Sequence, residues 1–240
     1  MKYTYPHPLI TGKLVQRYKR FFADIALESG EIVTAHCPNT GPMTGVCEIG
    51  APVQLSHHQD PKRKLAYTWE MIWVDQVWVG VNTSMPNRLV HYGLQQNWFA
   101  ELSGFTQLSR EVAYGSQSSK IDFLLTSSEG RVYVEVKNTT WSQKQRALFP
   151  DTVTIRGQKH LQELMQMVSE GHRAVLLYFI HRVDCPEFSP GDSKDPTYGK
   201  LLRQAVAAGV EVLPYRFQVS PAGVECLGKA TLYMDPLPIA

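Results

Sequence analysis

The sequence predicts an α/β protein of the α+β type in two parts, a small N-terminal β-barrel of the OB type and a C-terminal α/β or α+β sandwich. In residues 1–82, short runs of alternating apolar and polar residues lie between turn residues, and no helical period appears. A polar connector follows at residues 82–87, and helical and strand-like runs then alternate to the C-terminus. We therefore expect two domains, residues 1–82 and residues 83–240.

The N-terminal part is predicted to be a barrel because about five short strands in this length would otherwise leave exposed edges, which closure removes. The expected strands are residues 9–22, 24–27, 32–36, 52–56, 65–74 and 77–81. The first of them carries a basic run of Lys13, Arg17, Lys19 and Arg20. This run either follows a phosphate backbone or is an ordinary solvated strand face.

The C-terminal part is predicted from helical spacing, apolar runs and glycine stops. Asn87 is expected to cap a first helix that ends near Gly104. A continuous apolar strand at residues 174–180 is typical of a sheet buried on both faces. The remaining expected elements are a strand at 108–114, a hairpin at 120–137, helices at 155–170 and 201–208, and a strand at 210–215.

The hairpin holds the candidate site. If its turn is centred on residues 128–129, Leu125 faces Val132 and Asp122 faces Glu135. Two carboxylates that close repel each other unless a hard divalent cation lies between them. Lys137 shares a face with Glu135 and could activate water or neutralise a phosphate. The alternative is an ordinary ion pair between Glu135 and Lys137, worth ~0.2–1 kcal/mol.

Two neighbouring segments are expected to converge on the hairpin. Glu111, in the preceding strand, offers a further acid for the metal. The first turn of the 155–170 helix offers Arg156, Gln158 and Lys159, and a helix N-terminus favours phosphate. The alternative for that turn is a solvated helix face.

Composition limits the classes of protein. The chain has 240 residues, 43% hydrophobic and 19% charged, with a net charge of +2, so a nucleic-acid-binding surface must be local. No apolar run is long enough to cross a bilayer, and the N-terminus lacks a signal-peptide core. The four cysteines have no zinc-ligand spacing. We expect a cytoplasmic protein without a membrane partner, with association to the nucleoid as an alternative location.

The whole chain resembles the sugar fermentation stimulation protein A family. The resemblance is carried by His36-Cys37-Pro38-Asn39-Thr40-Gly41, by Val81-Asn82-Thr83 with Pro86-Asn87, by Arg110-Glu111-Val112 with Ile121-Asp122-Phe123, by Val134-Glu135-Val136-Lys137-Asn138, and by Arg156-Gly157-Gln158-Lys159-His160. It implies an OB-like domain followed by a restriction-endonuclease-like mixed sheet flanked by helices, of the PD-(D/E)xK type. It also implies non-specific DNA binding and a role in regulating maltose metabolism.

Within that resemblance, Asp122, Glu135 and Lys137 match the second acid, third acid and lysine of the nuclease motif. Gln158 and Lys159 match its helical polar position. One departure is that Ile121, and not a proline, precedes Asp122.

Our leading hypothesis is a DNA-binding protein, largely non-specific for sequence, with a nuclease-like site. Asp122, Glu135 and Glu111 would bind Mg²⁺ or Mn²⁺, and Lys137 would act beside them. One alternative is an active metal-dependent deoxyribonuclease. The others are a non-catalytic, sequence-specific regulator and an interaction protein whose basic residues are only solvated surface.

Overall fold

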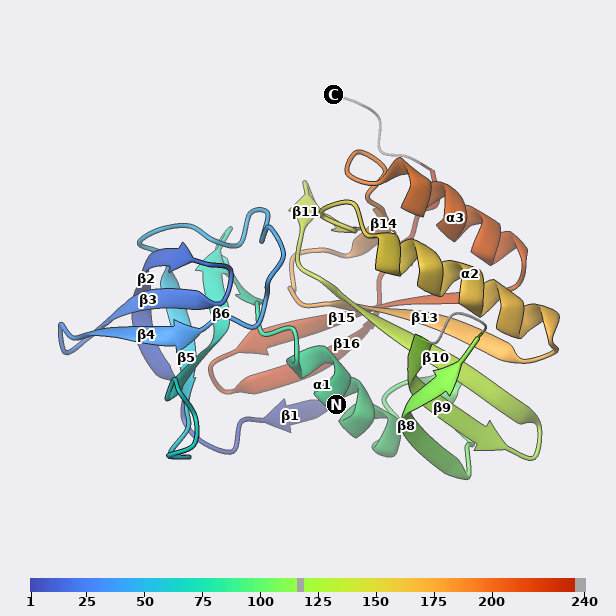
Figure 1. Ribbon diagram of the computed structural model, residues 1–240, viewed down its shortest axis with the longest axis horizontal. Helices are drawn as coiled ribbons and strands as arrows, with labels where there is room; N and C mark the ends of the chain where they lie inside the picture. Colours follow the sequence, from blue (N-terminus) through green and yellow to red (C-terminus); the bar gives the residue numbers. More distant parts are fainter. Residues whose placement is uncertain (116–118, 236–240) are drawn as a thin grey trace.

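The computed structural model describes residues 1–115 and 119–235 and has two lobes (Figure 1). The N-terminal lobe is a six-stranded sheet in the order β4-β3-β2-β5-β6-β7, and an extra β4–β6 pairing closes five of these strands into a barrel. The OB-like barrel predicted from the sequence is thus confirmed. Its strands are β2 (Ile10–Tyr18), β3 (Phe22–Leu27), β4 (Ile32–His36), β5 (Pro52–His57), β6 (Tyr67–Val74) and β7 (Val77–Gly80).

The C-terminal lobe is built on a seven-stranded mixed sheet in the order β1-β16-β15-β13-β10-β9-β8. The apolar run at 174–180 lies in central strand β13, which pairs in parallel with β10 and β15. The strands are β1 (Lys2–Thr4), β8 (Gln107–Tyr114), β9 (Ser119–Ser127), β10 (Gly130–Thr139), β13 (Arg173–Ile180), β15 (Glu211–Ser220) and β16 (Gly223–Lys229). A small second sheet contains β11 (Ser142–Gln143), β12 (Arg146–Phe149), β14 (Glu187–Pro190) and β17 (Thr231–Leu232).

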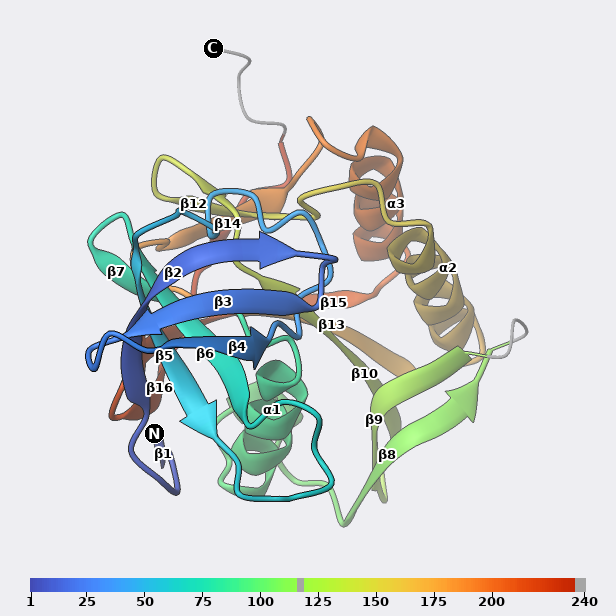
Figure 2. The same ribbon diagram turned by 60° about the vertical axis from the view of Figure 1, so that its left-hand side comes forward.

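Helices cover both faces of the seven-stranded sheet, as Figures 1 and 2 show. One face packs on α1 (Met85–Gln95) and the short 3-10 helix η1 (Ala100–Leu102). The other face packs on α2 (Ile155–Ser169) and α3 (Pro196–Ala207). Alternation along β10 sends Val134 and Val136 into the α1 side and leaves Glu135 on the α2 side. The predicted fold class is therefore confirmed, and none of the helices in the described residues is long and apolar enough to cross a membrane.

Three local predictions are corrected by the structure. Asn87 does not cap α1, because the helix begins two residues earlier, and the helix ends at Gln95 instead of near Gly104. Residues 187–190, for which no strand was predicted, form strand β14. Residues 2–4, for which no strand was predicted, form β1 and pair with β16 in the C-terminal sheet.

The β9–β10 hairpin has the predicted register only in its outer part. Leu125 pairs with Val132, as predicted, but the ladder ends at Phe123 and Val134, one pair before Asp122 and Glu135. Ile121 and Phe123 are two residues apart, yet they pack into different cores. Strand β9 is therefore bent at Asp122, which turns this carboxylate away from a regular cross-strand pair.

The barrel and the sheet lobe are joined by close contacts at the end of β7 and at the turn between β6 and β7. The Gly80 N–H donates to the main-chain oxygen of His181 at 3.0 Å. The Arg182 guanidinium donates to Asp75 of the barrel at 3.0 Å and to Asp184 at 2.6 Å. These contacts fix the barrel relative to the sheet that carries the candidate site.

We predict that Gly80→Ala destabilises the protein by about 1–3 kcal/mol, because an added Cβ would lie 2.1 Å from His181 Nε2. The free energy of unfolding in urea measures this loss. Shortening the neighbour in a Gly80→Ala/His181→Ala double variant should cost less than the two single changes together. Costs that simply add would contradict a direct contact between the two positions.

Candidate functional site

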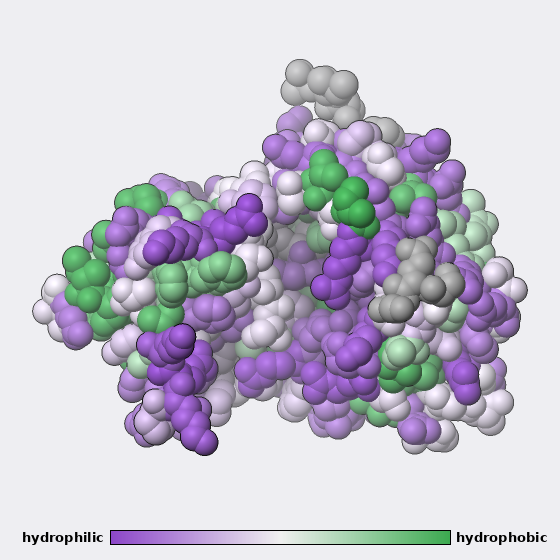
Figure 3. Space-filling view, in the orientation of Figure 1, coloured by the Kyte–Doolittle hydropathy of each residue, from purple (hydrophilic) through white to green (hydrophobic). Residues whose placement is uncertain are grey.

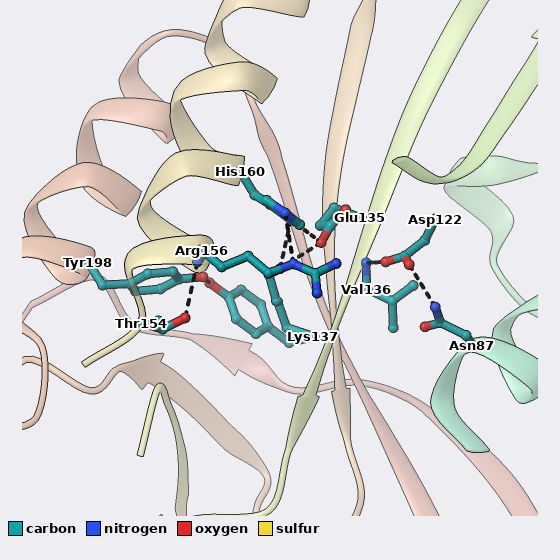
Figure 4. Close-up of polar contacts among 11 residues, drawn as sticks. Asn87, Asp122, Glu135, Val136, Lys137, Thr154, Arg156, His160 and Tyr198 are labelled. Atoms are coloured by element: carbon teal, nitrogen blue, oxygen red, sulfur yellow. Dashed lines mark hydrogen bonds and ion pairs between the residues drawn. The ribbon is translucent and has the colours of Figure 1, made fainter. Parts of the chain in front are cut away.

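Asp122 is held at the bend of β9 by two hydrogen bonds (Figure 4). Its Oδ2 accepts the Val136 N–H at 2.7 Å, and its Oδ1 accepts the Asn87 side-chain amide at 2.7 Å. The bend exposes the Val136 N–H to the carboxylate, since the β9–β10 ladder has already ended there. Asn87 reaches it from the first turn of α1.

Glu135 and Lys137, both on β10, meet His160 of α2 in a buried cluster. Lys137 Nζ donates to Glu135 Oε1 at 2.7 Å and lies 3.2 Å from His160 Nδ1. The same Glu135 oxygen contacts His160 Nδ1. Arg156 Nε donates to His160 Nε2 at 3.3 Å, and because a guanidinium only donates, the proton of a neutral imidazole lies on Nδ1, facing Glu135.

The two carboxylates have different electrostatics. Burial, and then the charge of Glu135, raise the pKa of Asp122 to about 6, against its hydrogen bonds and Lys137. Burial also opposes ionisation of Glu135. There, the Lys137 ammonium and His160 together outweigh burial and hold the pKa of the Glu135 carboxyl below its usual range. Near pH 6 the site therefore has one firmly ionised acid and one that is titrating.

The donor set fits a hard divalent cation. Glu135 Oε2 is buried and has no hydrogen-bond partner among the described residues. An unpaired buried oxygen of this kind calls for an ordered ion or water. Within residues 1–115 and 119–235, no three His, Cys, Asp or Glu side chains are arranged to hold a metal by themselves. Two carboxylates plus several waters is nevertheless a set that Mg²⁺ accepts.

Glu111 is not brought to this cluster. It lies on β8 with a left-handed φ of 53°, and its side chain is exposed. Glu111 lies opposite Asp122, because its neighbours Arg110 and Val112 pair with Phe123 and Ile121. The left-handed conformation of Glu111 and the bend of β9 therefore occur at the same point of the sheet. A left-handed non-glycine residue inside a strand is uncommon, and the sequence carries no signal for it.

The three residues predicted in the first turn of α2 lie in different surroundings. Arg156 is exposed and lies over His160. Gln158 turns to the other side, where its amide donates to both carboxylate oxygens of Asp195 at 3.0 Å. Lys159 is half-buried. Of the three, Arg156 alone combines exposure with contact to the Glu135 cluster.

Of the four basic residues predicted as a run in the barrel, one is held by hydrogen bonds to the main chain and three are exposed. The Arg17 guanidinium donates to the main-chain oxygens of Asn39 and Gly41, at 2.8 and 2.9 Å, and so holds the loop after β4. Lys13 is exposed on β2, and Lys19 and Arg20 form the exposed turn between β2 and β3.

Sequence reasoning missed Asn87 and His160 as parts of the site. His160 follows Arg156 by four residues, so their contact on one face of α2 could have been read from helical spacing. Its contact with Glu135 depends on how α2 packs on the sheet. Asn87 reaches Asp122 from a helix 35 positions earlier in the chain, for which no local pattern exists.

The fold defines a two-part protein in which a closed OB-type barrel is joined to a mixed sheet covered by helices, with two acids and a lysine on neighbouring strands of that sheet. The family model described as the SfsA N-terminal OB domain matches residues 15–81, and that of the sugar fermentation stimulation protein RE domain matches residues 84–223. The chain belongs to the sugar fermentation stimulation protein family.

Similar proteins support that assignment. A sugar fermentation stimulation protein homolog of Synechococcus sp. (strain JA-2-3B'a(2-13)) is 61% identical over 96% of this chain and 95% of its own. The homolog of Thermosynechococcus vestitus is 60% identical over 96% of this chain and 97% of its own. The solved structure of Pyrococcus furiosus SfsA in complex with Ca²⁺ superposes with a TM-score of 0.89, at 23% identity, covering 97% of this chain and 99% of that one, which shows the shared fold.

Proposed function

We propose that this protein binds DNA, largely without sequence preference, and that Asp122, Glu135 and Lys137 form a nuclease-like divalent-cation site. The observation that carries the proposal is the unpartnered Glu135 Oε2, buried beside Asp122 and the Lys137 ammonium. Ca²⁺ in the structure of Pyrococcus furiosus SfsA supports a divalent cation, and we propose Mg²⁺ or Mn²⁺ here. The family's name supports a role in the regulation of sugar metabolism.

Each side chain has a distinct part in this proposal. Asp122 and Glu135 would hold the cation, which when bound would neutralise charge on a phosphate and lower the pKa of a bound water. His160 and Lys137 both occupy Glu135 Oε1, so that Oε2 is left without a protein partner among the described residues. Lys137 has three donor hydrogens and gives one to Glu135, so it can donate another to a phosphate oxygen or to water.

DNA would lie along the surface between the two lobes. Figure 3 shows a hollow between the barrel and the sheet lobe, with hydrophilic surface on both sides. We propose that Lys13, Lys19 and Arg20 of the barrel, and Arg156 of α2, contact phosphates. Lys159 is proposed as a further phosphate contact, whereas Arg17 and Gln158 would act mainly by holding the loop after β4 and the start of α3, to which they are hydrogen-bonded. Contacts of this kind give affinity without base recognition.

An active Mg²⁺- or Mn²⁺-dependent nuclease is the second candidate, and Lys137 favours it. A site that only binds a cation has no need of a lysine buried against one of its acids, where desolvation is costly. A regulator that binds one operator without cutting DNA is an outcome of the test below.

The test combines binding and cleavage. We expect the affinity for random duplex DNA, measured by fluorescence anisotropy, to fall steeply as salt rises, because phosphate contacts release counterions. Linear, circular and single-stranded DNA are then incubated with Mg²⁺, Mn²⁺ or chelator. The Asp122→Asn and Glu135→Gln variants are compared with Glu129→Gln, which changes an exposed acid in the β9–β10 turn.

Three outcomes would change the proposal. Binding that is indifferent to salt would contradict phosphate contacts. Metal-dependent cleavage that survives both site substitutions would contradict the assigned site. Binding that strongly prefers one sequence, with no cleavage of any substrate, would identify the non-catalytic regulator.

A further inference from the structure

The turn between β2 and β3 places an exposed aromatic ring beside two exposed basic side chains. Phe21 has 49% of its surface exposed, and no other phenylalanine, tyrosine or tryptophan of the described residues is as exposed. Lys19 and Arg20 directly precede it, and both are exposed. Neither basic side chain has a hydrogen-bond or ion-pair partner within residues 1–115 and 119–235. All three side chains are therefore available to a ligand.

The backbone of this turn is unfavourable for the residues that it contains. Lys19 and Arg20 have left-handed φ values of 48° and 65°. Such values are uncommon outside glycine, and hairpin turns that need them usually contain Asn-Gly or Asp-Gly. Backbone outliers of this kind cluster where the chain contacts a ligand. In the turn between β6 and β7, which also has two left-handed residues, Asp75 uses its position to bind Arg182.

The turn is fixed to a neighbouring loop. One nitrogen of Arg17, Nη2, donates to three main-chain oxygens, those of Arg20 at 3.3 Å, Asn39 at 2.8 Å and Gly41 at 2.9 Å. The Cys37 N–H donates to the main-chain oxygen of Phe21 at 2.7 Å. The turn and the loop after β4 are thus one unit, which holds the exposed ring in place and lowers the entropy lost when a ligand binds.

This unit faces the sheet lobe. Figures 1 and 2 show the end of β2 and the start of β3 on the side of the barrel that is turned toward that lobe. The loop after β4 contacts the start of α1, since Thr83 Oγ1 donates to the main-chain oxygen of Pro38 at 2.9 Å. Helix α1 carries Asn87, whose amide holds Asp122. The ring therefore lies on the barrel surface that is directed toward the proposed cation site.

We infer that Phe21 stacks on an unpaired nucleobase while Lys19 and Arg20 contact the adjoining phosphates, so that the substrate class is DNA with unpaired bases, as in single strands, frayed ends and flaps. This inference rests on the proposed function and deepens it. An exposed ring beside cations is the combination that binds single strands, because the ring stacks on a base and the cations hold the backbone. A base inside an intact duplex is already stacked and must leave the helix to be reached.

The other exposed aromatic side chain of the barrel lacks this electrostatic setting. Trp73 is 38% exposed and stacks edge-on against Trp78. It lines a shallow groove together with Glu48 and Asp75, and none of the described residues that line this groove is a lysine or an arginine. Two acids repel a phosphate backbone, so Trp73 is the matched control for an exposed ring without cations.

The experiment compares DNA with and without unpaired bases, in chelator so that no substrate is cut. Fluorescence anisotropy measures affinity for a single strand of about 12 nucleotides, within the site size of an OB fold, and for the blunt duplex of the same sequence. We expect Phe21→Ala to weaken binding of the single strand by about fivefold to a hundredfold, the loss of one stacked base. Binding of the duplex should change far less, and Trp73→Leu should bind both as the wild type does.

The kind of contact is shown by two further readouts. Phe21→Ala should leave the salt dependence of binding unchanged, whereas Lys19→Gln should lower the slope of log affinity against log salt by about 0.7 on the single strand. A single strand that contains 2-aminopurine reports stacking, because its emission changes when the base stacks on a ring. Phe21→Trp should keep that change, and Phe21→Leu, which keeps an apolar side chain without a ring, should lose it. Thermal unfolding confirms that the variants are folded.

The outcomes separate this inference from the proposed function. Single-strand affinity that is the same in Phe21→Ala and the wild type would overturn the stacking role and leave salt-dependent DNA binding standing. Equal losses on single strand and duplex, or full binding by Phe21→Leu, would overturn it as well, because neither is expected of a ring that stacks on an unpaired base. A wild-type protein that binds neither form of DNA would overturn both the inference and the proposed function.

Discussion

Replacing Glu135 with alanine is expected to destabilise the protein by about 3–5 kcal/mol, the usual cost of breaking a buried ion pair by removing one partner. Only 11% of the Lys137 side chain and 4% of the Glu135 side chain are exposed, so the lysine charge would be left in a poorly solvated place. His160 would also lose the acceptor for its Nδ1 proton. The free energy of unfolding in urea, with the slope of the transition checked, measures the loss.

The matched control is an ion pair of similar length at the surface. Arg173 Nε and Glu211 Oε1 are 2.8 Å apart, but their side chains are 48% and 35% exposed. Glu211→Ala should therefore cost no more than about 1 kcal/mol. Equal losses in Glu135→Ala and Glu211→Ala would contradict the claim that burial makes the first pair different.

A double variant tests where the cost comes from. Replacing both partners, as Glu135→Leu with Lys137→Met, should recover most of the stability lost in Glu135→Ala, since apolar residues of similar volume tolerate the same surroundings. Recovery of stability together with loss of cation binding would show that the pair is kept for the site and not for the fold. The wild-type arrangement would then be a cost that function imposes on stability.

The parts of the fold that the sequence predicted are those set by local patterns. Period-two alternation located the barrel strands, and glycine stops located the ends of α2 and α3. The outer hairpin register followed from the position of the turn, as the Leu125–Val132 pair shows. The identity of the candidate acids and the lysine came from the same local spacing.

The parts that the sequence did not predict depend on contacts between distant segments. The β1–β16 pairing joins Lys2 to Glu225, and nothing in either short run specifies the other. Asp122 leaves its expected pairing because β9 bends where Glu111 takes a left-handed conformation. The third acid was placed on Glu111 because this residue is next in the sheet, and its exposed, left-handed conformation is not specified by any local pattern.

Asp122→Asn is expected to have the opposite effect to Glu135→Ala and to stabilise the metal-free protein at pH 8 by about 2–3 kcal/mol. The pKa of Asp122 is about 6 in the folded protein, above the ~3.9 of an unfolded chain. The folded state therefore binds the Asp122 proton more tightly than the unfolded state, so stability is lost as pH rises from about 4 through 6. Asparagine removes this loss while keeping an oxygen that can accept the Val136 N–H.

The measurement is the free energy of unfolding as a function of pH, with chelator and then with Ca²⁺. With chelator, the gain from Asp122→Asn should be largest above pH 7 and vanish below about pH 4. With Ca²⁺, the wild type should recover the difference, because the cation favours ionised Asp122 and binds the folded state alone. A gain that does not depend on pH would contradict the raised pKa.

Asp24, on β3 of the barrel, provides a control of opposite sign. The hydrogen bond from Gln16, with others from Thr34 and Tyr18, lowers the pKa of its carboxyl. Asp24→Asn should therefore destabilise the protein at neutral pH, with a loss that fades as the solution is acidified, and Ca²⁺ should leave that loss unchanged. The Asp122 pattern is expected only of a carboxylate whose ionisation destabilises the folded protein and whose charge is compensated when a cation binds. Finding that pattern at Asp122 and not at Asp24 would assign the cation site by thermodynamics alone, whether or not DNA is cut there.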